Sequence, residues 1–96
     1  MPEIDVSSEI SRLRLEIAEI DGEIVRLAAE RMRCAEKIGD FKKLLGLDVT
    51  VPSVEEAVKA RYVSGALKVG LSAECASKLA EVLIAEAKRV QMEKNV

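Results

Sequence analysis

The sequence contains no histidine, and this absence removes several kinds of enzyme from consideration. Without an imidazole, Ser-His and Cys-His nucleophile pairs cannot form, and zinc sites built on histidine ligands are excluded. The chain also lacks a Cys-x-x-Cys pair, a glycine-rich phosphate loop and a Gly-x-Ser-x-Gly turn. Any catalysis must therefore depend on binding, positioning and fixed charge, and we expect no metal ion and no cofactor.

Aromatic residues are scarce, at 2% of the chain, and the 15 basic and 17 acidic residues are interspersed. Without a basic tract or interleaved aromatics, we expect no nucleic-acid partner. No apolar run approaches the ~20 residues that cross a bilayer, so we expect no membrane span, and residues 1–5 do not resemble a signal peptide. Cys34 and Cys75 have no close spacing, so we expect reduced, buried thiols in a cytoplasmic protein.

What is present is typical of a helical bundle: 49% of the residues are hydrophobic and 33% are charged. Ninety-six residues make one domain, 1–96. Apolar periodicity predicts an all-α fold with a long helix at about 8–45, a short one at about 54–68 and a medium one at about 73–93.

Short signals mark where these helices begin and end. Ser7 and Ser8 precede Ile10, the first periodic residue, and mark the start of the first helix, while Ser53 to Glu56 matches a capping box for the second. Ser72 is expected to cap the third helix. Glycines 46 and 70 are expected to end the first two helices.

One long seam organises the first helix. Steps of three and four residues from Ile10 reach eleven positions, ten of them apolar: Ile10, Leu13, Ile17, Ile20, Ile24, Leu27, Arg31, Cys34, Ile38, Phe41 and Leu45. A helix over this apolar seam would be roughly 54 Å long, too long for the rest of the chain to cover. We therefore predict an obligate oligomer, most simply a two-fold homodimer whose long helices bury each other's seams, the alternative being a bent or frayed helix in a monomer.

Arg31 is the one charged residue of the apolar seam. Lys42 follows three helical turns later and points in nearly the same direction, with Ala35 and Ile38 between them. The pair could form a cationic slot for a small dianion. Alternatively, Arg31 sets the register of helix packing, as single polar seam residues can, and Lys42 is solvated.

Two more polar residues are candidates for the same site. Arg14 lies 17 residues before Arg31, too far along the helix to share a ligand with it. It could complete the slot of a partner chain in an antiparallel dimer, or simply face solvent. Gln91 continues the apolar stripe of the third helix and would point inward, unless the helix end frays.

Together these residues resemble the all-helical chorismate mutases. The resemblance covers about residues 10–92 and includes Leu13-Arg14-x-x-Ile17-x-x-Ile20-Asp21, Leu27-Ala28-x-Glu30-Arg31, Ile38-Gly39-x-x-Lys42 and Leu83-Ile84. No single motif is specific, but the joint spacing of four polar residues is: Arg14, Arg31, Lys42 and Gln91.

The resemblance implies an isomerase of phenylalanine and tyrosine biosynthesis that converts chorismate to prephenate. It also implies an intertwined homodimer with two shared sites. Arg14 from the partner chain and Arg31 would bind the two carboxylates of chorismate. Lys42 and Gln91 would bind the ether oxygen as its C–O bond breaks, and Glu55 would bind the ring hydroxyl.

The sequence departs from the family pattern on the second helix side. Val51 and Val54 stand where an aspartate and an arginine are common, and Ala87 stands where a hydroxyl residue is often found. The related isochorismate pyruvate-lyases have an apolar, proline-containing loop here, so that activity is one alternative. A non-catalytic helical dimerisation or regulatory module is another.

Overall fold

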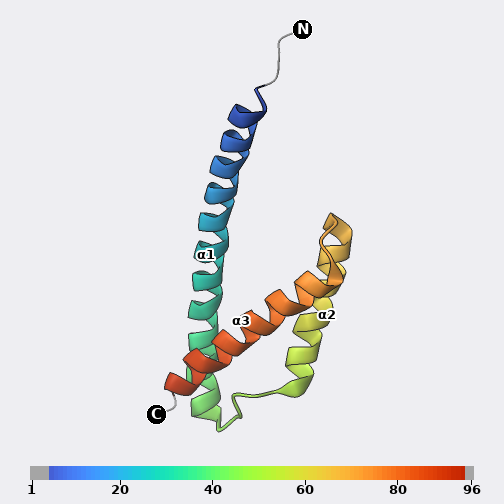
Figure 1. The fold of residues 1–96 in the computed structure, drawn as a ribbon. Helices are drawn as coiled ribbons and strands as arrows, with labels where there is room; N and C mark the ends of the chain where they lie inside the picture. The colour runs from blue at the N-terminus through green and yellow to red at the C-terminus, as the bar shows by residue number, and fades with distance from the viewer. Residues whose placement is uncertain (1–4, 95–96) are drawn as a thin grey trace. The chain divides into compact units, whose positions relative to one another are not determined.

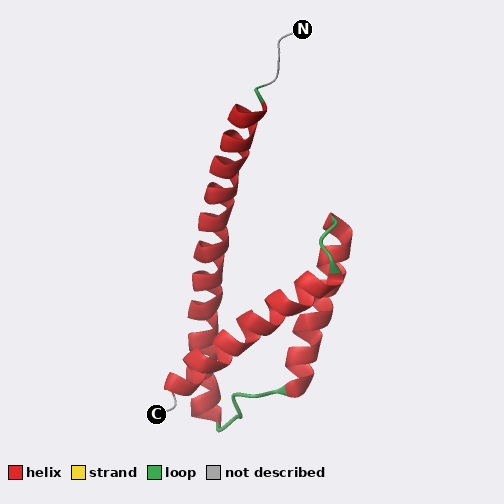
Figure 2. Cartoon of the chain, in the orientation of Figure 1, coloured by secondary structure: helices red, strands yellow, loops and turns green. Residues whose placement is uncertain are grey.

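Residues 5–94 fold into three helices (Figures 1 and 2). A computed structural model describes residues 5–94. The helices are α1 (Val6–Leu45), α2 (Pro52–Val69) and α3 (Ala73–Lys94), and none of the residues from 5 to 94 lies in a strand. The predicted all-α fold is confirmed. The predicted domain 1–96 and the prediction about the N-terminus extend into residues 1–4 and 95–96, outside the described part.

α1 begins two residues earlier than predicted, because Asp5 rather than a serine caps it. The Asp5 Oδ1 accepts hydrogen bonds from the backbone N–H groups of Ser7 and Ser8, at 3.1 and 3.3 Å. The Ser8 hydroxyl donates to Oδ2 at 2.9 Å. These bonds favour the carboxylate and lower the pKa of Asp5 below its ordinary value.

α2 also begins earlier than predicted, and the capping box at Ser53 is wrong. Val51 is the N-cap residue and makes no side-chain cap, while Pro52 occupies the first turn. Proline favours this position because its φ is already helical and its missing N–H would have no intrahelical partner. The Val51 carbonyl accepts hydrogen bonds from Val54 and Glu55 N–H, so Ser53 lies inside the helix.

The predicted glycine stops are both confirmed. Gly46 and Gly70 have φ values of 67° and 80°, the left-handed region that glycine enters at little cost. After each glycine the next N–H bonds back into the helix: Leu47 to the Lys42 carbonyl at 2.8 Å and Leu71 to the Ala66 carbonyl at 2.9 Å. α1 therefore ends at Leu45, three residues after Lys42, and the loop that follows borders the cavity described below.

The chain divides into two compact units, residues 1–30 and residues 31–96. The first unit contains residues 6–30 of α1, and the apolar seam along these residues is about half exposed. The exposed fractions run from 44% to 57% for six residues: Ile10, Leu13, Ile17, Ile20, Ile24 and Leu27. Nothing within residues 5–30 covers this stripe, since they form a single helix.

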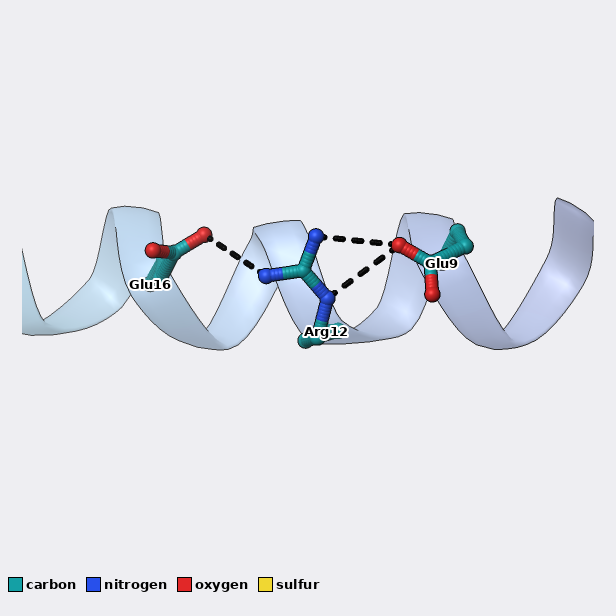
Figure 3. Close-up of polar contacts among 3 residues, drawn as sticks. All are labelled: Glu9, Arg12 and Glu16. Atoms are coloured by element: carbon teal, nitrogen blue, oxygen red, sulfur yellow. Dashed lines mark hydrogen bonds and ion pairs between the residues drawn. The ribbon is translucent and has the colours of Figure 1, made fainter.

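Ion pairs stabilise the same stretch of helix away from the apolar seam. Arg12 lies between Glu9 and Glu16, with N–O distances of 2.9 and 3.3 Å (Figure 3). Arg26 repeats the arrangement with Glu23 and Glu30. Pairs spaced three and four residues apart each add a few tenths of a kcal/mol, ~0.2–0.5, to an exposed helix.

In the second unit, α3 folds back from α2 and packs on it and on the end of α1 (Figure 1). The predicted α3 stripe supplies four buried residues: Ala76, Ala80, Ile84 and Val90. Ala35 and Ala66 complete this core, whose small side chains let the helices approach closely. Cys34 and Cys75 are free and exposed, contrary to prediction, because Cys34 borders a cavity and Cys75 lies in the first turn of α3. No helix in residues 5–94 is long and apolar enough to cross a membrane.

Ser72 caps α3 as predicted, since its Oγ accepts the backbone N–H of Cys75 at 3.1 Å. Replacing Ser72 with alanine should lower the free energy of unfolding by about 1 kcal/mol. Ser72→Asp, which keeps an acceptor, should retain most of the stability. Urea denaturation followed by circular dichroism tests both, and equal stability of Ser72→Ala and the parent would contradict this role.

Candidate functional site

A cavity of about 500 Å³ lies between the end of α1, the loop after it, α2 and α3. This volume is in the range of small-molecule sites. Six charged or amide residues line it: Arg31, Lys42, Glu55, Arg61, Lys88 and Gln91. The rest of the lining is apolar or weakly polar: Cys34, Ala35, Ile38, Val49, Val51, Val54, Val58, Ile84 and Ala87. Four cations face one carboxylate, so the cavity suits an anion.

Lys42 is anchored at the end of α1 nearest the loop. Its ammonium donates to the Val49 carbonyl at 2.9 Å and to the Gln91 Oε1 at 3.1 Å. An ammonium has three protons, so these two bonds leave one for a ligand. The two acceptors also fix the direction of the side chain, which lowers the entropy lost when a ligand binds.

Gln91 is buried, with 6% of its surface exposed, as its place in the α3 stripe predicted. Its Nε2 donates to the Ala35 carbonyl at 3.0 Å, while its Oε1 accepts from Lys42. These opposite partners set the orientation of the amide. The second Nε2 proton is not used by the Ala35 bond and is available to a ligand.

Gly39 makes the approach of Gln91 possible. A Cβ at this position would lie 2.9 Å from the Gln91 Cγ and 3.3 Å from its Cα, closer than carbon atoms pack. Gly39 is itself buried, one turn after Ala35 on the same face of α1. The missing side chain therefore lets Gln91 cross α1 and reach the Ala35 carbonyl.

Arg31 reaches the cavity from the same helix, three turns before Lys42. Its NH1 donates to the Leu83 carbonyl at 3.4 Å, which ties the side chain to α3. A guanidinium has five N–H donors, so most remain for an anion. Arg31 and Lys42, with Ala35 and Ile38 between them, thus line the cavity from one face of α1, and their role toward a ligand stays a prediction.

Glu55 and Lys88 face each other across the cavity from α2 and α3. The Lys88 Nζ lies 3.4 Å from the Glu55 Oε2, and 35% and 23% of the two side chains are exposed. The Oε2 atom itself is buried and has no hydrogen-bond donor among residues 5–94. The pair is therefore electrostatic, with an acceptor still to be satisfied.

Four of the five predicted site residues thus line one cavity: Arg31, Lys42, Glu55 and Gln91. Arg14 belongs to the first unit and the cavity to the second, so its contribution stays a prediction. The three departures from the family pattern, Val51, Val54 and Ala87, also line the cavity.

Sequence reasoning did not assign Arg61 and Lys88 to the site. Lys88 could have been found, because it lies one turn after buried Ile84 and one turn before Gln91 on α3. Within residues 5–94, no three His, Cys, Asp or Glu side chains cluster to hold a metal ion.

The fold and the cavity together define an all-helical protein with a small-molecule-sized cavity lined by four cations. Residues 13–92 match the family model described as chorismate mutase type II. This match covers most of the chain, which belongs to that family, and the predicted resemblance is confirmed.

A curated relative is the bifunctional chorismate mutase/prephenate dehydratase of Aquifex aeolicus (strain VF5). It is 42% identical over 50 residues, which make up 52% of this chain and 14% of the relative. The matched part therefore spans about one seventh of that longer protein.

Gly39 gives a test of the α1–α3 contact. Gly39→Ala should lower the free energy of unfolding by roughly 1–3 kcal/mol, because the new methyl displaces Gln91. Gly65→Ala is the matched control, since nothing lies within 4 Å of a Cβ there. It should stabilise α2 by up to about 1 kcal/mol. Urea denaturation measures both, and a gain in stability for both variants would rule out the tight contact.

Proposed function

We propose that this chain is a chorismate mutase that converts chorismate to prephenate in phenylalanine and tyrosine biosynthesis. The observation that carries the proposal is the pair of donors made by Lys42 and Gln91. Each is held by protein acceptors and each keeps a proton for a ligand in a cationic cavity. Membership of the chorismate mutase type II family supports the substrate.

The reaction explains why a chain without histidine can be an enzyme. Chorismate rearranges within one molecule: the ether C–O bond breaks as a new C–C bond forms, and no proton is transferred. The enzyme needs only to hold the compact conformer and to stabilise negative charge that develops on the ether oxygen. Lys42 and Gln91 would donate to that oxygen, and Glu55 would accept from the ring hydroxyl.

The proposal includes a homodimer with shared sites. Arg31 would bind one carboxylate of chorismate, and Arg14 of the partner chain would bind the other. The half-exposed apolar seam supports this assembly, because a continuous apolar stripe of this size in water favours burial against a second chain. Two free thiols support the proposed cytoplasmic location, where cysteines stay reduced.

Isochorismate pyruvate-lyase is the second candidate, and the apolar wall of Val49, Val51 and Val54 keeps it open. This activity would release salicylate and pyruvate from isochorismate. Assaying the purified chain with each substrate separates the two proposals, because prephenate and salicylate are distinct products. Salicylate formation without prephenate formation would favour the lyase, and no turnover of either would favour a non-catalytic module.

Lys42→Ala should lower kcat for prephenate formation by ~10²–10³, comparable to the loss of an oxyanion donor. The matched control is Lys37→Ala, which removes an exposed lysine of α1 that does not line the cavity. Lys37→Ala should keep near-normal turnover. Steady-state kinetics on both variants make the comparison, and near-normal turnover of Lys42→Ala would refute the assignment.

Shared sites can be tested by mixing two inactive variants. Arg14→Ala and Arg31→Ala chains should each be weak alone. After subunit exchange, a mixed dimer should regain one intact site of two, because both substitutions then fall in the same site. Activity is measured before and after exchange, with size-exclusion chromatography to establish the dimer, and lack of recovery in a proven mixed dimer would contradict shared sites.

A further inference from the structure

We propose that Lys88 is a substrate-binding residue, which contacts a carboxylate of the dianion from the α3 side of the cavity. This inference rests on the proposed function, since it takes the ligand to be the chorismate dicarboxylate. Lys88 adds a cation from α3 to the site. The other cations of the lining lie on α1 (Arg31 and Lys42) and on α2 (Arg61).

Lys88 lies on the face of α3 that borders the cavity. It lies on α3 between Ile84 and Gln91, both buried, and it lines the cavity with Gln91. Its partner is Glu55 of α2, 3.4 Å away. A lysine drawn to a carboxylate inside a cavity is already desolvated in part and oriented, so a ligand anion meets a prepared charge.

Glu55, the ion-pair partner of Lys88, has a hydrogen-bond acceptor that is unsatisfied within residues 5–94. Its Oε2 is buried without a hydrogen-bond donor among the described residues, and Lys88 at 3.4 Å balances its charge without completing its hydrogen bonding. A buried acceptor left in this way favours a ligand that brings its own donor. A ring hydroxyl on Glu55 would place the rest of the same ligand beside Lys88. The pair thus suits a ligand that carries both a hydroxyl and a carboxylate.

The apolar wall limits where a carboxylate of the ligand can find a cation. Val51 and Val54 offer no charge to a carboxylate on their side of the cavity. Arg61 also lines the cavity, but it is exposed, whereas Lys88 is about one third exposed. Because solvent and salt weaken exposed charges most, Lys88 should attract a carboxylate more strongly than Arg61 does.

Kinetics of Lys88→Gln test the inference. The KM for chorismate should rise about tenfold while kcat changes less than threefold, since the lysine binds ground state and transition state alike. Lys88→Arg should keep KM within threefold of the parent. Lys78→Gln, an exposed lysine of α3 outside this cavity, should leave both constants unchanged. A rise in KM below fivefold for Lys88→Gln, or a larger rise for Arg61→Gln, overturns the proposal.

A double substitution separates substrate binding from mere support of Glu55. If Lys88 acted only through Glu55, Glu55→Gln and the double variant Glu55→Gln/Lys88→Gln would have equal KM. If Lys88 contacts the substrate, the double variant should have a KM at least fivefold higher than Glu55→Gln. Equal values overturn the proposal.

Prephenate titration separates failure of this inference from failure of the proposed function. Calorimetry measures its binding to the parent chain and to Lys88→Gln. If chorismate is not turned over but prephenate binding weakens at least fivefold in Lys88→Gln, the proposed function fails and the Lys88 site stands. If chorismate is turned over and neither KM nor prephenate binding depends on Lys88, only this inference fails. If the parent neither turns over chorismate nor binds prephenate, both fail.

Discussion

The second unit depends on one buried amide. Gln91 joins α3 to α1 through the Ala35 carbonyl and at the same time holds the Lys42 ammonium. A buried amide without partners would cost ~1–3 kcal/mol, so these two bonds are needed for stability as much as for any ligand. Gly39 removes the side chain that would obstruct them. The same residue, Gln91, therefore fixes the packing of α3 on α1 and the position of the Lys42 ammonium.

A second constraint is the length of α1. Residues 6–30 of this 40-residue helix form a unit of their own, and a single helix has nothing within itself against which to bury an apolar stripe. Within this unit, ion pairs such as Arg12 with Glu9 and Glu16 add to helix stability, while the apolar seam is about half exposed. These local charge pairs support the helix, but they do not bury its exposed apolar seam. A second copy of the same helix would bury this seam. In the proposed homodimer, the same contact would bring Arg14 of the partner chain to the site.

The sequence predicted the three helices and both glycine stops, because period and turn chemistry are local properties. It misplaced the start of α2, since Val51 carries no side-chain cap and Pro52 supplies the start instead. It predicted that Gln91 points inward, but not its bond to Ala35, which depends on how two helices cross. The spacing of α3 places Lys88 on the same face as Ile84 and Gln91, but its partner is a matter of helix packing. Its ion pair with Glu55 joins residues 33 positions apart, and no spacing along one helix encodes it.

The apolar wall changes what the charges in the cavity can do. The side chains of Val49, Val51 and Val54 carry no charge and no hydrogen-bonding group, so this side of the cavity is apolar. In such surroundings a fixed ammonium acts on developing charge more strongly than it would in water. A reaction that needs only a held conformer and one stabilised oxygen suits this arrangement. Because the side chains of that wall are apolar, the proposed binding of the substrate's carboxylates would depend on cations elsewhere in the lining, among them Arg31, Lys42 and Lys88.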